Sequence, residues 1–220
     1  MKISPIPRRE LPVFAGIEEK DLDALLLCLN AYTRRYRAGE FVLLDQDEVR
    51  HVGLVLSGKV HALKEDSLGH KTLLAYLEAG EVFGETFAVK KEPESYVSFY
   101  AAANTQVLFL SMEHLLHPCK LNCPFHERLA ENVFHLLCEE NLRLIEKIEV
   151  CAKGSLREKI LAYLNILARK QGQKYITVPL NRTEMASYLQ SNRSAMSREL
   201  AEMKAEGIID YDGSTFVLKG

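Results

Sequence analysis

Residues 181–203 have the sequence NRTEMASYLQSNRSAMSRELAEM, which predicts two short helices separated by a tight turn. Asn181 can accept hydrogen bonds from the first-turn amides while Glu184 returns one, so the pair predicts a capping box at the start of the first helix. The turn falls at 190–192, where Asn192 can cap the second helix. The spacing of the apolar residues predicts a core-facing side on each helix. These residues are Met185, Ala186, Leu189, Met196, Leu200 and Met203.

The opposite side of the second helix carries Arg193, Ser194, Ser197 and Arg198. Arginine can pair with guanine O6 and N7, and small hydroxyl side chains allow close approach to base edges or phosphates. This face therefore suits the major groove of DNA. Two surface helices in a helical bundle are the structural alternative, because helix-turn-helix patterns are often matched by chance.

The next residues, 207–218, have the sequence GIIDYDGSTFVL, which predicts two short strands around an Asp212–Gly213 turn. A hairpin directly after a recognition helix is the wing of a winged helix-turn-helix. The combination is far more specific than either half and favours a DNA-binding module.

Length and charge agree with a separate module at this end. The 220 residues suffice for one large or two modest domains. Residues 152–220 contain 11 lysines and arginines against 7 aspartates and glutamates, whereas the rest of the chain is acidic. This asymmetry suggests nucleic-acid binding confined to one end. We expect a cytoplasmic protein without a membrane contact, because no apolar run is long enough to span a bilayer and the N-terminus has no apolar core of a signal peptide.

Upstream, the apolar pattern changes from helical to strand-like. Residues 17–30 predict a short amphipathic helix, and short β-rich runs with glycine turns between them follow. Even spacing of such runs predicts an antiparallel barrel or roll. The runs are residues 41–44, 52–56, 60–63, 72–77, 96–101 and 105–110.

A long helix is predicted from near Pro124 to about Cys151, with two apolar stripes. Leu129, Val133, Leu136 and Ile145 form one stripe, which we expect to cover the roll. The other has the alternating spacing of a coiled-coil seam and predicts a homodimer, in which a buried Asn141 would fix the register. This dimer stripe is Phe134, Leu137, Asn141, Leu144 and Ile148. A single wide core stripe in a monomer is the alternative. The chain breaks at 152–155, and residues 156–169 predict another helix.

This order of parts resembles the Crp/Fnr family of bacterial transcription regulators, and the resemblance covers nearly the whole chain. Its most specific motifs are GEVFGE at 80–85, RTEMA at 182–186 and RSAMSR at 193–198. The resemblance implies an α+β fold with an N-terminal antiparallel, jelly-roll-like β-roll, a long central dimerisation helix and a C-terminal winged helix-turn-helix. We expect a cyclic-nucleotide-binding-like sensor domain at 1–118, the dimerisation helix at 119–151 and the DNA-binding domain at 152–220.

By the same resemblance, Arg193, Ser194 and Arg198 match positions that touch bases, and Arg182 matches one that contacts phosphate. Ser194 departs from the glutamate common there, which changes the expected half-site. The implied partners are a second copy of the chain, double-stranded DNA with a near-palindromic site, and RNA polymerase. The full set of expected DNA-binding residues is Arg182, Thr183, Arg193, Ser194, Ser197 and Arg198.

The effector site departs more strongly from the family pattern. Members that bind cyclic AMP carry Arg-Ser or Arg-Thr shortly after Gly-Glu, whereas the matching residues here lie near Ser95 and Tyr96 and offer no cation. An anionic phosphate would lack its charge-assisted partner, so we expect no response to cyclic AMP. A retained pocket would suit a small apolar or cationic ligand. The expected pocket residues are Gly84, Glu85, Tyr96, Leu144 and Ile145.

Residues 114–126, HLLHPCKLNCPFH, contain a Cys-x3-Cys-x2-His pattern formed by Cys119, Cys123 and His126. Thiolate and imidazole ligands suit zinc, iron or haem. A cytosolic cysteine pair can instead sense redox state, or the residues can simply pack at the helix start. These three interpretations remain open, so the cofactor is unknown.

The leading functional hypothesis is therefore a homodimeric, sequence-specific DNA-binding regulator that responds to an effector other than cyclic AMP or to a redox or metal signal. The alternative is a nucleotide-binding-like module that regulates through protein contacts. The sequence shows no phosphate-cradling loop, no nucleophile elbow and no carboxylate pair placed by motif, so we do not expect an enzyme.

Overall fold

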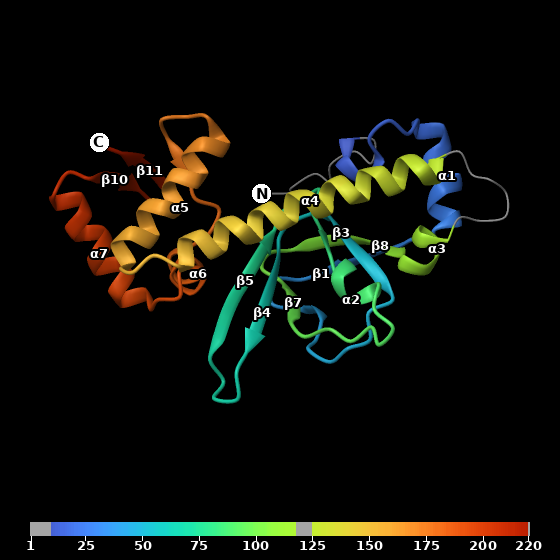
Figure 1. Cartoon of the computed structure of the whole chain (residues 1–220), viewed down its shortest axis with the longest axis horizontal. Helices are drawn as coiled ribbons and strands as arrows, with labels where there is room; N and C mark the ends of the chain where they lie inside the picture. The colour runs from blue at the N-terminus through green and yellow to red at the C-terminus, as the bar shows by residue number, and fades with distance from the viewer. Residues whose placement is uncertain (1–9, 118–124, 220) are drawn as a thin grey trace. The chain divides into compact units, whose positions relative to one another are not determined.

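The computed structural model describes residues 10–117 and 125–219 (Figure 1). The chain divides into two compact units, Met1–Glu139 and Glu140–Gly220. The division falls within the long helix α4, Phe125–Cys151, so this helix contributes residues to both units. The three-part division at residues 118 and 151 remains a prediction.

The first unit contains two four-stranded antiparallel sheets, which confirms the predicted roll. One sheet has the strand order β1-β8-β3-β6 and the other the order β2-β7-β4-β5. All the predicted runs form strands. The strands are β1 Tyr32–Tyr36, β2 Phe41–Leu43, β3 His51–Ser57, β4 Val60–Glu65, β5 Lys71–Leu77, β6 Val82–Phe83, β7 Ser98–Ala101 and β8 Thr105–Ser111.

Strand β3 separates two hydrophobic cores because successive side chains of a strand point to opposite faces. Val52 and Leu54 belong to the core beneath the helices, whereas Val55 belongs to the core formed with strands of both sheets. Phe83 of β6 and Phe99 of β7 bring the two sheets together, with ring centroids 4.9 Å apart. A Cβ at Gly53 would lie 2.3 Å from the Phe83 ring, so this position requires glycine.

Helices cover the outer face of the β1-β8-β3-β6 sheet. Leu129, Val133 and Leu136 of α4 are buried in the helical core, as the first apolar stripe predicts. Asn132, on the same helix, donates from Nδ2 to the carbonyl oxygens of Val13 and Ala15 at 3.0 and 2.9 Å. The other helices for which the structure gives full bounds in this unit are η2 Pro12–Phe14, α1 Glu19–Cys28, α2 Glu85–Ala88 and α3 Met112–Leu116.

The second apolar stripe of α4 is exposed. Phe134 is 65% exposed and Ile148 is 67% exposed, and the other members of the predicted dimer stripe also face solvent. Ile145, which was expected in the roll-facing stripe, is 55% exposed. None of the helices described is both long and apolar enough to cross a membrane.

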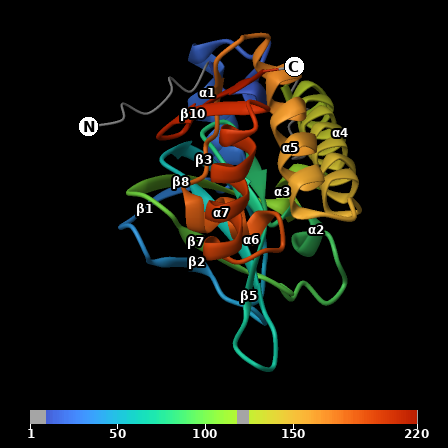
Figure 2. The same ribbon diagram turned by 90° about the vertical axis from the view of Figure 1, so that its left-hand side faces the viewer.

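The second unit contains the predicted helix pair and hairpin. Helices α6, Arg182–Tyr188, and α7, Arg193–Ala205, lie against each other (Figure 2). Helix α5, Leu156–Gln171, begins with a capping box formed by Ser155 and Glu158. The strands β9 Ile176–Thr177, β10 Ile209–Asp212 and β11 Thr215–Leu218 form an antiparallel sheet in the order β10-β11-β9.

Candidate nucleic-acid interface

The start of α6 has the capping box that its sequence predicts. Asn181 Oδ1 accepts from the backbone N–H groups of Thr183 and Glu184 at 2.9 and 3.0 Å. Glu184 Oε2 accepts in return from the Asn181 N–H at 2.8 Å. These bonds satisfy amides that the first helical turn leaves unpaired, and so they determine where α6 begins.

The turn between α6 and α7 is tight because Gln190 adopts a left-handed conformation with φ of 54°. Asn192 then caps α7 by accepting from the Ala195 N–H at 2.8 Å, as predicted. Met196, Leu200 and Met203 are buried beneath α7. Its solvent face is formed by Arg193, Ser194, Ser197 and Arg198, which are all exposed. The structure therefore gathers these four residues, which were predicted to face DNA, on one face of one helix.

The wing is an antiparallel hairpin. Asp212 of β10 pairs with Thr215 of β11, which leaves Gly213 and Ser214 as the tip. Ile209 and Phe216 are fully buried and attach the hairpin to the helices. The prediction of two strands around an Asp-Gly turn is confirmed.

Arg182 does not extend freely into solvent. Its guanidinium lies 4.9 Å from the ring centroid of Tyr211 and 4.7 Å from that of Phe216. Its Nη2 donates to the carbonyl oxygen of Gly213 at 2.7 Å. Burial lowers the pKa of Arg182. Arg182, which was expected to contact a DNA phosphate, therefore already binds the wing of its own chain.

An ion-pair cluster that sequence reasoning missed joins α5 to α7. Arg157 Nε donates to Glu199 Oε1 at 2.6 Å, and Nη1 and Nη2 donate to the two carboxylate oxygens of Glu206 at 2.6 and 2.9 Å. Hydrogen bonds to Glu206 and then Glu199 raise the pKa of Arg157. The partners lie 42 and 49 residues away in sequence, so no local motif could have revealed them.

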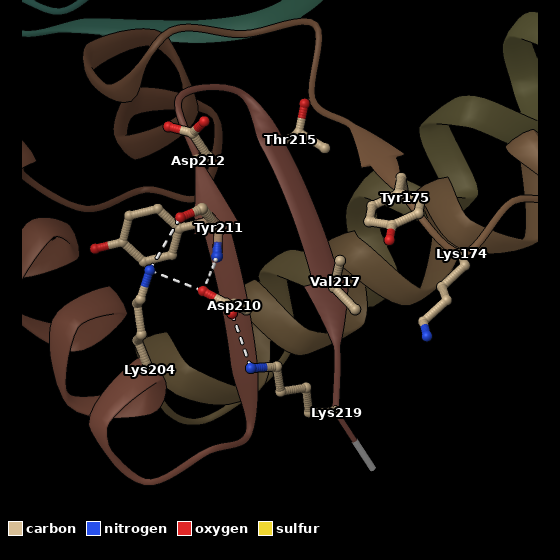
Figure 3. A pocket seen from close by; sticks show the side chains of 9 residues that line it. All are labelled: Lys174, Tyr175, Lys204, Asp210, Tyr211, Asp212, Thr215, Val217 and Lys219. Carbon is tan, nitrogen blue, oxygen red and sulfur yellow. Dashed lines mark hydrogen bonds and ion pairs between the residues drawn. The ribbon is translucent and has the colours of Figure 1, made fainter.

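A groove of about 440 Å³ lies beside the wing (Figure 3). At its centre Asp210 binds two lysines, with Lys204 Nζ at 2.7 Å and Lys219 Nζ at 2.8 Å. Hydrogen bonds from these two lysines hold the pKa of Asp210 well below its usual range. Lys204 Nζ also donates to the Tyr211 carbonyl oxygen at 3.1 Å and lies 4.9 Å from the Tyr211 ring centroid.

The C-terminal part of α4 packs against α6. Lys147 Nζ lies 3.7 Å from the ring centroid of Tyr188, and Cys151 Sγ lies 4.0 Å from the Tyr188 carbonyl oxygen. Burial lowers the pKa of Lys147 to about 8, although the nearby Cys151 partly opposes this effect. These contacts determine the environment of the last residue of α6.

Within the roll, Glu85 is 9% exposed and begins α2 directly after Gly84, whose φ is 84°. Glu85 Oε1 accepts from the Thr86 hydroxyl at 2.9 Å, whereas Oε2 is buried and has no hydrogen-bond partner among the described residues. Tyr96 is 57% exposed, and Lys90 Nζ lies 3.9 Å from its ring centroid. Lys90 therefore places a cation near this site, which the sequence analysis did not predict. Leu144 and Ile145 belong to the second unit and are exposed.

Only part of the Cys-x3-Cys-x2-His pattern can be placed, because Cys119 and Cys123 lie outside the described residues. His126 is 5% exposed, and its Nε2 lies 2.9 Å from the carbonyl oxygen of His114. Since a carbonyl only accepts, Nε2 carries the proton, and Nδ1 has no hydrogen-bond partner in the described parts of the chain. Within residues 10–117 and 125–219, no group of three or more His, Cys, Asp or Glu side chains is arranged to hold a metal.

Two family models match the chain in the same order as the two folded parts. The cyclic nucleotide-binding domain matches residues 33–121, and the Crp-like helix-turn-helix domain matches residues 158–219. The second match contains α6, α7 and the wing.

Similar proteins span most of the chain. The transcriptional activator protein FnrL of Cereibacter sphaeroides is 23% identical, over 96% of this chain and 85% of the relative. The cyclic AMP receptor protein of Thermus thermophilus is 26% identical, over 90% of this chain and 88% of the relative. The relatives are transcription regulators and not enzymes.

Solved structures share the fold. The regulator CLP of Xanthomonas campestris superposes with a TM-score of 0.74 at 21% identity, over 92% of this chain and 100% of that one. A CooA mutant from Carboxydothermus hydrogenoformans gives a TM-score of 0.72 at 20% identity, over 99% and 94% of the two chains. With both domain models matched in sequence order, the chain belongs to the Crp/Fnr family of transcription regulators, which bind DNA through a helix-turn-helix and act as dimers.

Proposed function

We propose that this protein regulates transcription as a homodimer that places the two α7 helices in successive major grooves of a near-palindromic DNA site and contacts RNA polymerase from there. The observation that supports this proposal best is the solvent face of α7, where Arg193, Ser194, Ser197 and Arg198 are exposed above a buried opposite side. A two-fold dimer requires half-sites about 34 Å apart, one helical turn of DNA.

Each group on this surface has a distinct role in the proposal. Arg193 and Arg198 supply donor forks for guanine edges. The hydroxyls of Ser194 and Ser197 allow the helix to approach the bases closely. Thr183, exposed at the start of α6, faces the phosphate backbone of the DNA. Arg182 lies at the edge of this surface, where its charge still contributes to the field that attracts phosphate.

The dimer stripe of α4 supports the homodimer. Phe134, Leu137, Leu144 and Ile148 are 65%, 37%, 48% and 67% exposed in the single chain. Such a row of large apolar side chains on one helix costs free energy in water, and pairing with the same row of a second copy removes that cost. Asn141 lies within the row and favours one register of the two helices.

The proposed effector is a small molecule without a cyclic phosphate. Ser95, at the position where cyclic-AMP-binding members place their cation, is buried and donates from Oγ to the Val97 carbonyl oxygen at 2.6 Å. The Lys90 ammonium covers the Tyr96 ring. Glu85 Oε2 is buried without a hydrogen-bond partner in the described part of the chain, which favours a ligand that donates a hydrogen bond or carries positive charge. Calorimetry should therefore detect no binding of cyclic AMP at micromolar concentration, and a micromolar affinity would contradict this assignment.

A redox or metal signal is the other proposed input, through Cys119, Cys123 and His126. The buried His126 supports it, because its Nδ1 has no hydrogen-bond partner among residues 10–117 and 125–219. Elemental analysis of untagged protein tests for a metal, and thiol counting with and without reductant tests for a cysteine pair.

Selection of bound fragments from random DNA, with and without reductant, tests the main proposal. We expect enrichment of an inverted repeat whose half-sites are one helical turn apart, and an affinity that falls steeply with salt. Failure to enrich any sequence, together with binding that is insensitive to salt, would favour a module that acts through protein contacts.

A further inference from the structure

We infer that Arg182 is a positioning residue, which holds the wing hairpin at a set angle to the recognition helix α7. This inference rests on the proposed DNA binding. It assigns to Arg182 a role within the protein, in addition to any charge it presents to phosphate.

The contacts of Arg182 all lead to the wing. The side chain starts at the first residue of α6, and its guanidinium lies 4.9 and 4.7 Å from the ring centroids of Tyr211 and Phe216. The Tyr211 side chain is on β10 and the Phe216 side chain on β11, so one cation contacts both strands of the hairpin. A cation that is desolvated over two aromatic faces is held more strongly than one at an exposed site.

The hydrogen bond of Arg182 reaches the tip of the wing. Nη2 donates to the Gly213 carbonyl oxygen at 2.7 Å, the distance of a charge-assisted bond. Gly213 has φ of 54°, a conformation that glycine adopts without strain. Arg182 therefore contacts both strands and the turn that joins them. A planar guanidinium can stack on the rings and donate sideways at the same time, which a lysine ammonium cannot.

The same tyrosine is also attached to α7. Lys204 Nζ, near the C-terminal end of α7, lies 4.9 Å from the Tyr211 ring centroid and donates to the Tyr211 carbonyl oxygen at 3.1 Å (Figure 3). Tyr211 thus connects the first residue of α6, through Arg182, with the end of α7, through Lys204. Fixing one hairpin to both helices sets the position of the tip, Gly213 and Ser214, relative to the exposed face of α7.

The test uses the whole 220-residue chain and four variants of it. Arg182→Lys keeps the charge and most of the stem but loses the stacked fork. Tyr211→Leu removes one aromatic face without changing any charge. Arg182→Ala removes both the positive charge and the guanidinium fork. Lys174→Ala is the control, because it removes an exposed positive charge next to the same groove. Two quantities are measured: the affinity for the selected DNA site as a function of salt, and amide hydrogen exchange of residues 212–215 in the DNA-free protein.

If Arg182 positions the wing, Arg182→Lys and Tyr211→Leu both accelerate exchange at the tip and both weaken specific binding about tenfold. The salt slope of Tyr211→Leu stays that of the parent protein because no charge is lost. Lys174→Ala leaves tip exchange unchanged. Thermal unfolding of each variant identifies the folded fraction, so that affinity is compared between folded proteins.

A different outcome would overturn the inference. If Arg182→Lys and Tyr211→Leu bind like the parent protein, and Arg182→Ala only lowers the salt slope by about 0.9, Arg182 is simply a phosphate contact. Unchanged exchange at the tip in Arg182→Lys and Tyr211→Leu also refutes the positioning role. The exchange measurement needs no DNA, so failure of the parent protein to bind any DNA site would count against the proposed function and leave the exchange result valid.

Discussion

Arg157 of α5 and Glu206, the C-cap residue of α7, form a paired ion bridge in which two guanidinium nitrogens donate to the two carboxylate oxygens at 2.6 and 2.9 Å. The third donor, Nε, binds Glu199, a half-buried residue of the same helix. Glu199 lies within α7, outside the exposed face formed by Arg193, Ser194, Ser197 and Arg198, and Glu206 lies at the C-terminal end of the helix. One arginine therefore anchors α7 to α5 at two points separated by about two helical turns.

Replacing Arg157 should loosen this anchor. Arg157→Ala leaves Glu199 and Glu206 without their shared cation, so we expect a lower melting temperature of the second unit and weaker DNA binding. The deficit should shrink at high salt, because salt weakens the ion pairs of the parent protein and screens the repulsion between the two carboxylates that the variant leaves unpaired. Arg169→Ala, at an exposed site on the same helix, is the matched control. Equal melting temperatures for the two variants would show that the bridge contributes nothing to stability.

We expect substitutions on the exposed face of α7 to reduce the preference of the protein for particular DNA bases. Arg193→Ala and Arg198→Ala should each cost about 1–3 kcal/mol at the base pair that the arginine contacts, and each should relax the preference there. Comparing the selected DNA sequences of parent and variants measures the effect. If both variants retain the affinity and the sequence preference of the parent protein, α7 does not read bases through this face.

The exposed stripe of α4 predicts that one charge can dissociate the dimer. Ile148→Glu or Phe134→Glu should give monomers in sedimentation experiments, because a carboxylate would be buried without a partner in the paired helices. Leu142→Glu is the control, since Leu142 is 60% exposed on the same helix but outside the stripe. A dimer that survives Ile148→Glu and dissociates with Leu142→Glu would place the interface on another face of the helix.

Much of the fold follows from local patterns. The glycine-punctuated apolar runs predict the roll, and the helical spacing predicts α1, α4 and α5. Strand β1, with the sequence YTRRY, was missed because four of its five residues are exposed and carry no apolar alternation. Strand β6 was missed because two residues are too few for a period. Its position matters, since Phe83 fills the space that Gly53 leaves open.

The candidate site was predictable wherever its determinants are close in sequence. Both helix caps, the turn and the Asp-Gly hairpin lie within a few residues of their partners, so the sequence alone identifies them. The hydrogen bond from the Arg182 side chain to the wing was not predictable from the sequence. Its partner Gly213 lies 31 residues away and is brought near only when the wing folds. The same reason hides the bridge from Arg157 to Glu206.

Gln190 predicts a measurable strain in the turn before α7. Its φ of 54° is left-handed, a conformation that costs a residue with a side chain about 1–2 kcal/mol and glycine almost nothing. Gln190→Gly should therefore leave stability unchanged or raise it by up to about 1 kcal/mol. Gln190→Val should lower it by about 1–2 kcal/mol, because a β-branched side chain tolerates this region least. Denaturant titration of the two variants measures the difference, and equal stabilities would contradict a strained turn.

Lys147 predicts a pH dependence of stability in the second unit. Burial lowers its pKa to about 8, and the unfolded chain retains the ordinary value near 10.5. Below pH 8 both states are protonated, so the native protein bears the full cost of a buried ammonium. Between pH 8 and 10.5 the native state releases its proton first, so this group makes the protein more stable as the pH rises.

Lys147→Met removes the buried charge and keeps an unbranched apolar stem against Tyr188. The shift corresponds to about 3 kcal/mol, and the lost cation–π contact offsets about 1–2 kcal/mol of it. We therefore expect the variant to be about 1–2 kcal/mol more stable at pH 7, with the advantage shrinking toward pH 10. Urea unfolding of parent and variant across this range measures the difference. Lys153→Met, at an exposed site just after α4, is the control for replacing a lysine by methionine away from Tyr188. A difference for Lys147→Met that stays constant between pH 7 and pH 10 would contradict the lowered pKa of Lys147.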